Sequence, residues 1–283
     1  MTAGIGLFGR TVAVEIGPEG GAGVRLADLR VGFKVTHTAS KAVSSAQIDI
    51  YNPSPVTIGL LRVPLAAIRL LVGYGGELGF PKLIFQGPPV KDGIELKVTG
   101  KDRILKVDAA DGGRAYVSTF LNLPIATPTT FGAVLSLVLA QTLWARGYID
   151  PQIESIVLPH GIVLLGRPAE VMDRLAASAL PFGADWFVRD NAVYVVAKGT
   201  STPEVAPLLS AAQGNLIGSP TQTKTGTKVR ALIDATMRPG MSFVVQSAMV
   251  NGLYIAKDVT FTGDSGWDTP YYMDITGKPA GVP

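Results

Sequence analysis

The chain has 283 residues, of which 47% are hydrophobic and only 17% charged, and its formal net charge is +3. This length accommodates two or three domains. The charge is small and no segment holds a block of basic residues, which argues against a dedicated nucleic-acid-binding protein. The absence of cysteine excludes disulfide bonds and thiolate chemistry, and it fits assembly in a reducing cytoplasm.

Charged residues are scarcer than in an average soluble protein, where they make up about a quarter of the chain. Two explanations are open: a well-packed apolar monomer, or a subunit whose surface is covered by partners, since interface cores are depleted in charge. The N-terminus lacks the basic and apolar regions of a signal peptide. The most apolar segment, 131–144, is too short to cross a bilayer, so no membrane insertion is expected.

Residues 1–110 predict a small antiparallel β-barrel. Short alternating segments are expected to form strands at 11–16, 30–36, 47–51, 67–74, 83–86 and 94–99. Turn residues separate them, and Asp92-Gly93 predicts a hairpin turn. Six or seven strands at this spacing are typical of a barrel or a sandwich.

Residues 111–204 predict an α+β module that begins near Asp111-Gly112-Gly113. Two helices are expected at 131–146, capped by Thr129 or Thr130, and at 168–180, opened by Pro168. Two hairpins are expected as well. One joins 153–158 to 162–165 across Pro159-His160-Gly161, and the other joins 185–189 to 192–197 across Asp190-Asn191.

Residues 205–283 predict a second small antiparallel β-barrel. Strand segments such as 242–247 and 251–256 alternate with turn residues, and Met237-Arg238-Pro239-Gly240 predicts a turn in which Gly240 takes a positive φ. The predicted fold is therefore mainly β with an α+β insert: two small antiparallel β-barrel domains, 1–110 and 205–283, flanking the middle module 111–204.

The order of these blocks resembles the tail hub (baseplate hub) proteins of tailed bacteriophages, which are related to the hub part of contractile-tail and type VI secretion spikes. The resemblance rests on turn and strand signatures. They are Gly73-Tyr74, Phe85-Gln86-Gly87, Gly166-Arg167-Pro168, Gly183-Ala184-Asp185-Trp186, Leu216-Ile217-Gly218-Xaa-Pro220 and Arg238-Pro239-Gly240. The last two are the most specific, and none of them carries chemistry.

The resemblance implies a structural virion protein of the tail tip or baseplate, assembled in the host cytoplasm, and not an enzyme. A homotrimer would join the tail tube or distal tail proteins to the central spike, and DNA would pass through its channel in transit. The tape measure protein is a further candidate partner. The chain ends soon after Trp267 without a needle-like repeat, so a separate spike or tail-tip protein is expected. A β-rich receptor-binding or accessory tail protein is the alternative, and a hydrolase a lesser one.

Gly263-Asp264-Ser265-Gly266-Trp267 imitates the nucleophile motif of trypsin-like proteases, with His37 far upstream. Such an enzyme needs Ser, His and Asp joined by hydrogen bonds. Here the fifth residue is Trp267 instead of Gly, and too few residues follow Ser265 for a specificity pocket. A glycine-rich turn is the expected structure, and no catalytic residue is predicted.

No cofactor or metal site is predicted either. His37 and His160 lack companion ligands, and we expect surface or hairpin-tip positions for both. Three carboxylates, Asp102, Asp108 and Asp111, lack the regular spacing of a calcium loop and are expected to be solvated turn residues.

Gly73-Tyr74-Gly75-Gly76 opens no helix, which argues against phosphate binding. Trp144, Trp186 and Trp267 are expected to be core or interface anchors, with Trp186 in the core.

Overall fold

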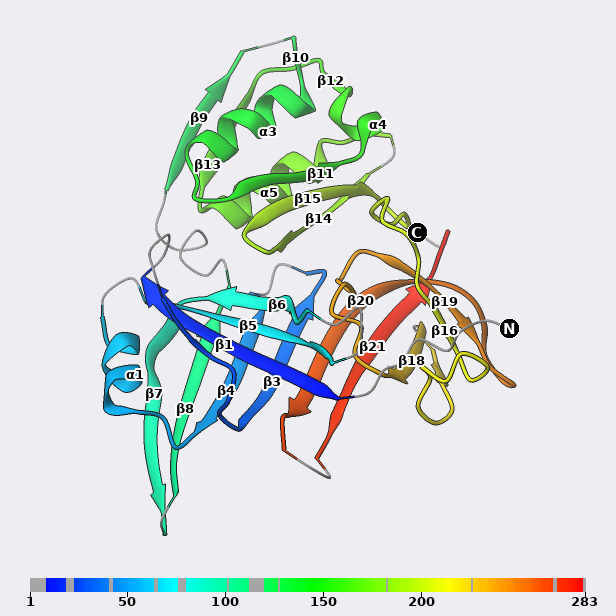
Figure 1. The fold of residues 1–283 in the computed structure, drawn as a ribbon. Coiled ribbons are helices and arrows are strands. Elements are labelled where there is room, and N and C mark those ends of the chain that lie inside the picture. Colours follow the sequence, from blue (N-terminus) through cyan, green and yellow to red (C-terminus); the bar gives the residue numbers. More distant parts are fainter. Residues whose placement is uncertain are drawn as a thin grey trace.

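The computed structural model describes residues 9–18, 23–40, 43–63, 66–75, 80–100, 102–111, 120–126, 128–181, 183–224, 226–266 and 269–281. Strands predominate, and nearly all their pairings are antiparallel. This confirms the predicted class, mainly β with an α+β part. Figure 1 shows a broad β body, made from the first and last parts of the chain, with the green middle module on top of it.

A ten-stranded sheet forms the main layer of the β body. Its principal order is β17-β18-β21-β20-β3-β4-β8-β7, and β16 and β19 attach beside β20. The N-terminal strands are β3 (Val31–Thr38), β4 (Ser45–Tyr51), β7 (Pro89–Thr99) and β8 (Asp102–Ala110). The C-terminal strands are β16 (Leu208–Ser210), β17 (Thr221–Thr223), β18 (Gly226–Ala231), β19 (Ser242–Gln246), β20 (Asn251–Asp264) and β21 (Tyr271–Pro279).

A second sheet, of four strands, covers one face of the first. Its order is β2 (Val24–Leu26), β1 (Arg10–Pro18), β5 (Ala66–Tyr74) and β6 (Lys82–Gly87). Helix α1 (Pro55–Leu61) lies beside β1 and β5 and begins at Ser54, whose hydroxyl accepts a hydrogen bond from the Thr57 amide. Apolar side chains from both sheets fill the space between them, as expected for two packed β layers.

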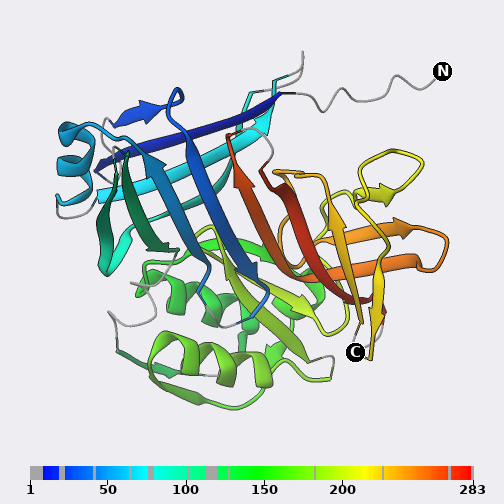
Figure 2. The same cartoon turned by 90° about the horizontal axis from the view of Figure 1, so that it is seen from below.

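The two β segments of the chain meet in the middle of the large sheet. Strand β3 pairs with β20 over seven residue pairs, from Thr38–Asp258 to Gly32–Asp264. Figure 2 shows the blue and cyan strands beside the orange and red ones. One hydrophobic core contains residues of both segments, such as Val14 and Phe261. The domain limits at 110 and 205 stay predictions, and the two β segments share a sheet and a core.

The middle module has its own core. Among its described residues, three helices pack with short strands: α3 (Phe131–Ala140), α4 (Pro151–Glu154) and α5 (Pro168–Ala177). The strands are β9 (Leu121–Ile125), β10 (Thr129–Thr130), β11 (Ala145–Ile149), β12 (Val157–Leu158), β13 (Ile162–Gly166), β14 (Ala184–Arg189) and β15 (Ala192–Ala197). Trp144 and Trp186 are buried there with ring centroids 6.1 Å apart, which confirms a core position for Trp186.

The structure confirms one predicted hairpin of the middle module and corrects a second hairpin and a helix. The hairpin across Asp190-Asn191 is confirmed, and both residues adopt positive φ, as two-residue hairpin turns require. The hairpin across Pro159-His160-Gly161 is wrong, because β12 pairs with β10 and β13 pairs with β9. The helix expected at 131–146 ends at Ala140, because residues 145–149 form a strand parallel to β15.

Asp92-Gly93 is not the predicted hairpin turn. These residues lie inside β7, in an irregular stretch where the register shifts between Pro89 and Ile94. The turn follows Thr99, at Gly100, and both Gly100 and Asp92 have a positive φ. A bulge and a hairpin turn both favour residues that tolerate positive φ, so the dipeptide alone does not distinguish them.

Candidate assembly surface

The large sheet has one buried face and one polar face along strands such as β3, β4 and β21, where buried and more exposed residues alternate. On β3, Val31, Phe33, Val35 and His37 point into the core and are at most 5% exposed. The residues between them point to the opposite face, which the second sheet does not cover. Such alternation is typical of an antiparallel sheet with one solvated side.

Hydroxyl and charged side chains line up across the polar face because the strands are in register. One row runs across five strands through Arg230, Asp274, Thr260, Thr36 and Ser45. The hydroxyls of Thr36 and Thr260 are 3.4 Å apart. The next row contains Tyr272, Thr262, Lys34, Gln47 and Asp108.

Ion pairs on this face join neighbouring strands. The Arg230 guanidinium donates to Asp274, Nε to Oδ1 2.7 Å, and lies 4.0 Å from the centre of the Tyr272 ring. Hydrogen bonding to Asp274 raises the pKa of Arg230. Lys106 pairs with Asp49 at 4.0 Å. In both pairs a positive charge is therefore balanced by a carboxylate on the neighbouring strand.

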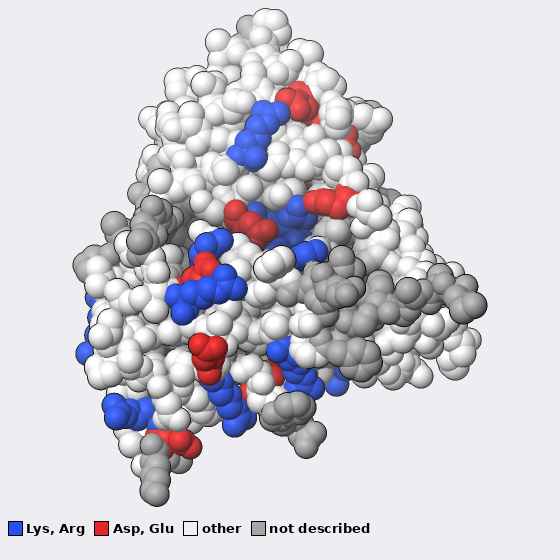
Figure 3. All heavy atoms as spheres, viewed as in Figure 1, with Lys and Arg blue, Asp and Glu red and all other residues white. Residues whose placement is uncertain are grey.

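At one end of the sheet, Arg30 and Asp264 fix the turn that follows β20. Arg30 donates twice to the Asp264 carboxylate, with Nη2–Oδ2 at 3.0 Å. Burial alone would raise the pKa of Asp264, but the hydrogen bonds from Arg30 and the Gly266 amide outweigh it and lower that pKa. On the face of the molecule that Figure 3 shows, basic and acidic side chains lie near one another and neither kind forms a large separate patch.

Three strands end the large sheet among the described residues: β7 on one side, β17 on the other, and β16 on the branch through β19. The Asn215 side chain bonds to the backbone of β16 at Leu208 and Ser210, so β7 and β17 are the two edges that stay free. A free edge presents unpaired backbone N–H and C=O groups and favours pairing with another chain. A sheet with two unlike free edges can join head to tail with copies of itself, and such contacts close into a ring when the rotation fits.

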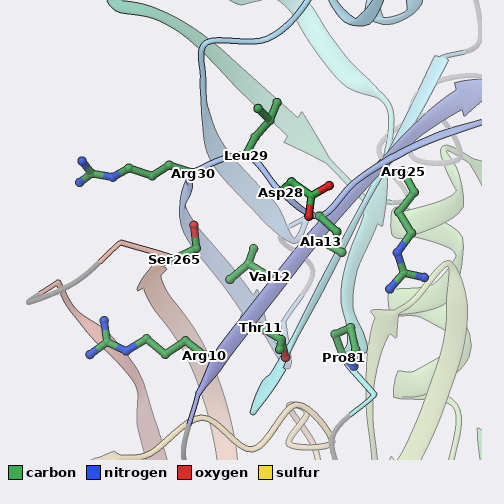
Figure 4. Close-up of a pocket in the computed structure, with 11 residues that line it drawn as sticks. Arg10, Thr11, Val12, Ala13, Arg25, Asp28, Leu29, Arg30, Pro81 and Ser265 are labelled. Atoms are coloured by element: carbon green, nitrogen blue, oxygen red, sulfur yellow. The ribbon is translucent and has the colours of Figure 1, made fainter. Parts of the chain in front are cut away.

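A pocket of about 460 Å³ lies between β1, the 27–30 loop and Ser265 (Figure 4). It is lined by three arginines, but each already has partners. Arg10 donates to the carbonyls of Gly266 and Thr269, Arg25 pairs with Glu15 and Arg30 pairs with Asp264. These arginines stabilise the turn and β1, so the pocket offers little free positive charge.

The residues of the protease-like motif lie far apart. The Ser265 hydroxyl accepts a hydrogen bond from the Val31 amide, at the start of β3. His37 is six residues further along that strand, or roughly 20 Å at the usual rise of a β-strand. Ser265 and His37 thus form no catalytic pair. Trp267 lies outside the described residues.

His37 is a core residue, so the predicted surface or hairpin-tip position is wrong for it. It is 1% exposed, its Nε2 lies 2.7 Å from the Ile84 carbonyl oxygen, and the rings of Phe85 and Phe261 flank it. Burial, and next the positive charge of Arg238, lower the pKa of His37 to about 4. His37 continues the alternating core stripe of β3, a signal already present in the sequence. His160, in contrast, is exposed.

The three aspartates weighed for calcium are spread along β8 and past its end. Asp102 accepts a hydrogen bond from Asn52, and Asp108 lies on the polar face, six residues away. Asp111 is 8% exposed, so it is not the solvated residue that was expected. Among the described residues, no group of three or more His, Asp or Glu side chains could hold a metal ion. Nor is any helix there long and apolar enough to cross a membrane.

Two arginines join the middle module to the β body. Arg238 donates to Asp190 of the module, Nε–Oδ2 3.3 Å, and to the Leu83 carbonyl of β6, Nη2–O 2.7 Å. Arg189 donates to the Pro239 carbonyl and pairs with Glu204. Only 12% of the Arg238 side chain is exposed. The turn at 237–240 is therefore a structural junction between the two parts.

Comparison with solved structures gives long, weakly identical matches. The tail protein of Neisseria meningitidis MC58 has a TM-score of 0.63 at 11% identity, over 97% of this chain and 98% of that one. A 43 kDa tail protein of prophage MuSo2 from Shewanella oneidensis has a TM-score of 0.62 at 9% identity, over 95% of this chain and 98% of that one. This is the fold of phage tail proteins related to the baseplate hub.

A third match extends that fold to secretion. The E. coli c3393 protein has a TM-score of 0.53 at 11% identity. It is described as a type VI secretion component with structural similarity to T4 tail proteins gp27 and gp5. The match covers 90% of this chain and 74% of that one. No family model and no curated protein matches the sequence. The shared fold is thus retained at identities near the level of unrelated sequences.

Proposed function

We propose that the protein is a structural component of a phage tail, a hub that joins the tail tube to a central spike or tail tip. The observation that supports this most is the combination of a shared tail-protein fold over nearly the whole chain with a large sheet that has two free edges. A hub needs surfaces for assembly more than a reactive site. The free strand edges of the described residues are surfaces of this kind.

The hub would be a homotrimer around a channel. Three copies joined head to tail would continue the large sheet around a closed ring, which removes its free edges. The buried face of each sheet is already covered by its own second layer, so the polar face would be turned to the channel. Its mixture of hydroxyls and opposite charges would let DNA pass without holding it.

Imaging of the purified protein together with tail-tube and spike partners tests this proposal. The expected particle is a threefold ring with an open lumen bordered by residues such as Thr36, Thr260 and Lys34. A monomer inside assembled tails would contradict the proposal. So would a ring in which these three residues face outward and the second sheet faces the lumen.

A further inference from the structure

The hairpin of β7 and β8 projects from the β body with an apolar side that the described residues leave partly exposed toward its tip. Figure 1 shows the hairpin extending below the rest of the sheet. On one side of β7 lie Ile94, Leu96 and Val98, opposite Val107, Leu105 and Arg103 of β8. Ile94 is partly buried, Leu96 is 39% exposed and Val98 is 68% exposed.

The opposite side of β7 is polar, although Ile104 of β8 lies opposite Lys97 there. Glu95 and Lys97 alternate with the apolar residues, and their side chains form an ion pair at 3.3 Å. Alternation of this kind indicates a strand with one covered side and one solvated side. The covered side is the one that continues the buried face of the large sheet, since Leu105 and Val107 are at most 1% exposed.

The apolar row therefore leaves the core and continues into solvent at the tip. Two exposed aliphatic side chains in one row, beside an unpaired strand edge, favour association with another chain. The edge from Ile94 to Thr99 is regular, because the register shift of β7 lies before Ile94. Six residues in regular register are enough to pair with a further strand.

We propose that this hairpin docks on the next copy of the chain, with Leu96 and Val98 covered by the neighbour's β body. The inference rests on the proposed ring and names the contact that closes it. A second copy fits because the same sheet ends in another free edge at β17, so one copy supplies both halves of the contact. Docking there also keeps the apolar side and the polar side of the joined sheets continuous.

Mass photometry across a range of concentrations tests the contact with matched variants. The double variant Leu96→Lys and Val98→Lys should lower the trimer population at least tenfold. The control Glu95→Ser and Lys97→Ser changes the other side of the same strand and should leave it within about twofold. Unchanged far-ultraviolet circular dichroism would show that both proteins fold, as expected for a hairpin outside the core.

Cysteine accessibility gives a second readout, because the natural chain holds no cysteine. In the oligomer, the Val98→Cys thiol should be alkylated at least tenfold more slowly than in dilute monomer. The Lys97→Cys thiol should react at similar rates in both. Slowing at both positions, or at neither, would contradict docking through the apolar side.

The outcomes separate this contact from the proposed function. If the wild-type chain forms a trimer and the double lysine variant does too, the hairpin contact is wrong and the hub proposal stands. If the wild-type chain stays monomeric with its tail partners, both are wrong. Irregular aggregates without a closed species would likewise contradict the docking.

Discussion

The ring of Phe187, in the middle module, lies directly against the α-carbon of Gly240, in the turn of the β body. A β-carbon built on Gly240 would overlap that ring. Gly240 also has φ = 84°, which confirms the positive φ predicted from Met237-Arg238-Pro239-Gly240. The sequence thus predicts the turn, and the structure adds a second reason for glycine there: the module packs onto it.

Gly240→Val should destabilise the protein severely. The β-branched residue meets both an unfavourable φ and the Phe187 ring, and the backbone strain alone costs on the order of 1–3 kcal/mol. Gly218→Val is the matched control, because Gly218 has φ = 69° with no atom within 4 Å of its built β-carbon. Chemical denaturation should give a larger loss for Gly240→Val. Equal losses would mean that the packing against Phe187 adds nothing.

Arg238→Ala should loosen the middle module from the β body. The change leaves Asp190 without its partner and removes hydrogen bonds to carbonyls on β6 and in the turn, for a cost of about 2 kcal/mol. Arg230→Ala is the control, since its ion pair with Asp274 is solvent-exposed and should cost well under 1 kcal/mol. For both variants, chemical denaturation measures the loss of stability, and limited proteolysis measures how fast the chain is cut between the middle module and the β body. Equal effects would contradict the junction.

His37 should make stability depend on pH. Its pKa is about 4 in the folded protein against an ordinary value of 6.5, so between these values the unfolded chain binds the additional proton. The contribution of His37 to the free energy of unfolding is therefore largest above pH 6.5 and falls as the pH drops toward about 4. The total change is roughly 3 kcal/mol. His37→Gln should flatten the denaturation profile in that window relative to wild type. His160→Gln, at an exposed site, should leave it unchanged; a flat wild-type profile would contradict the buried neutral histidine.

Ser265→Ala should be tolerated. The hydroxyl only accepts the hydrogen bond from the Val31 amide, and the backbone bond from Ser265 N–H to the Val31 carbonyl remains. The expected cost is about 1 kcal/mol, with assembly and infectivity intact. Complete tails that fail to infect would show that Ser265 has a chemical role.

Local patterns predicted many of the elements correctly. The stripe Val31, Phe33 and Val35 predicted the buried side of β3, and Asp190-Asn191 predicted the hairpin turn of the middle module. These signals are local, because side-chain alternation and positive φ depend on neighbouring residues. The stripe also extends to His37, for which we expected a surface or hairpin-tip position.

Long-range pairing could not be predicted in this way. Nothing near Gly32 or Asp264 indicates that these residues face each other across β3 and β20, since any alternating strand could pair there. For the same reason the row from Arg230 to Ser45, and with it the polar face, becomes visible only once the register is known. Helix α1 was not predicted, although it begins at Pro55 and proline favours a first helical position.

Cryo-electron microscopy of the assembled tail tip tests the central claim most directly. We expect three copies in a closed ring, joined through the β7 and β17 edges, with the hydroxyl row of Thr36 and Thr260 around an open lumen. A single copy at the tail tip, or a ring in which those threonines face away from the lumen, would contradict the account.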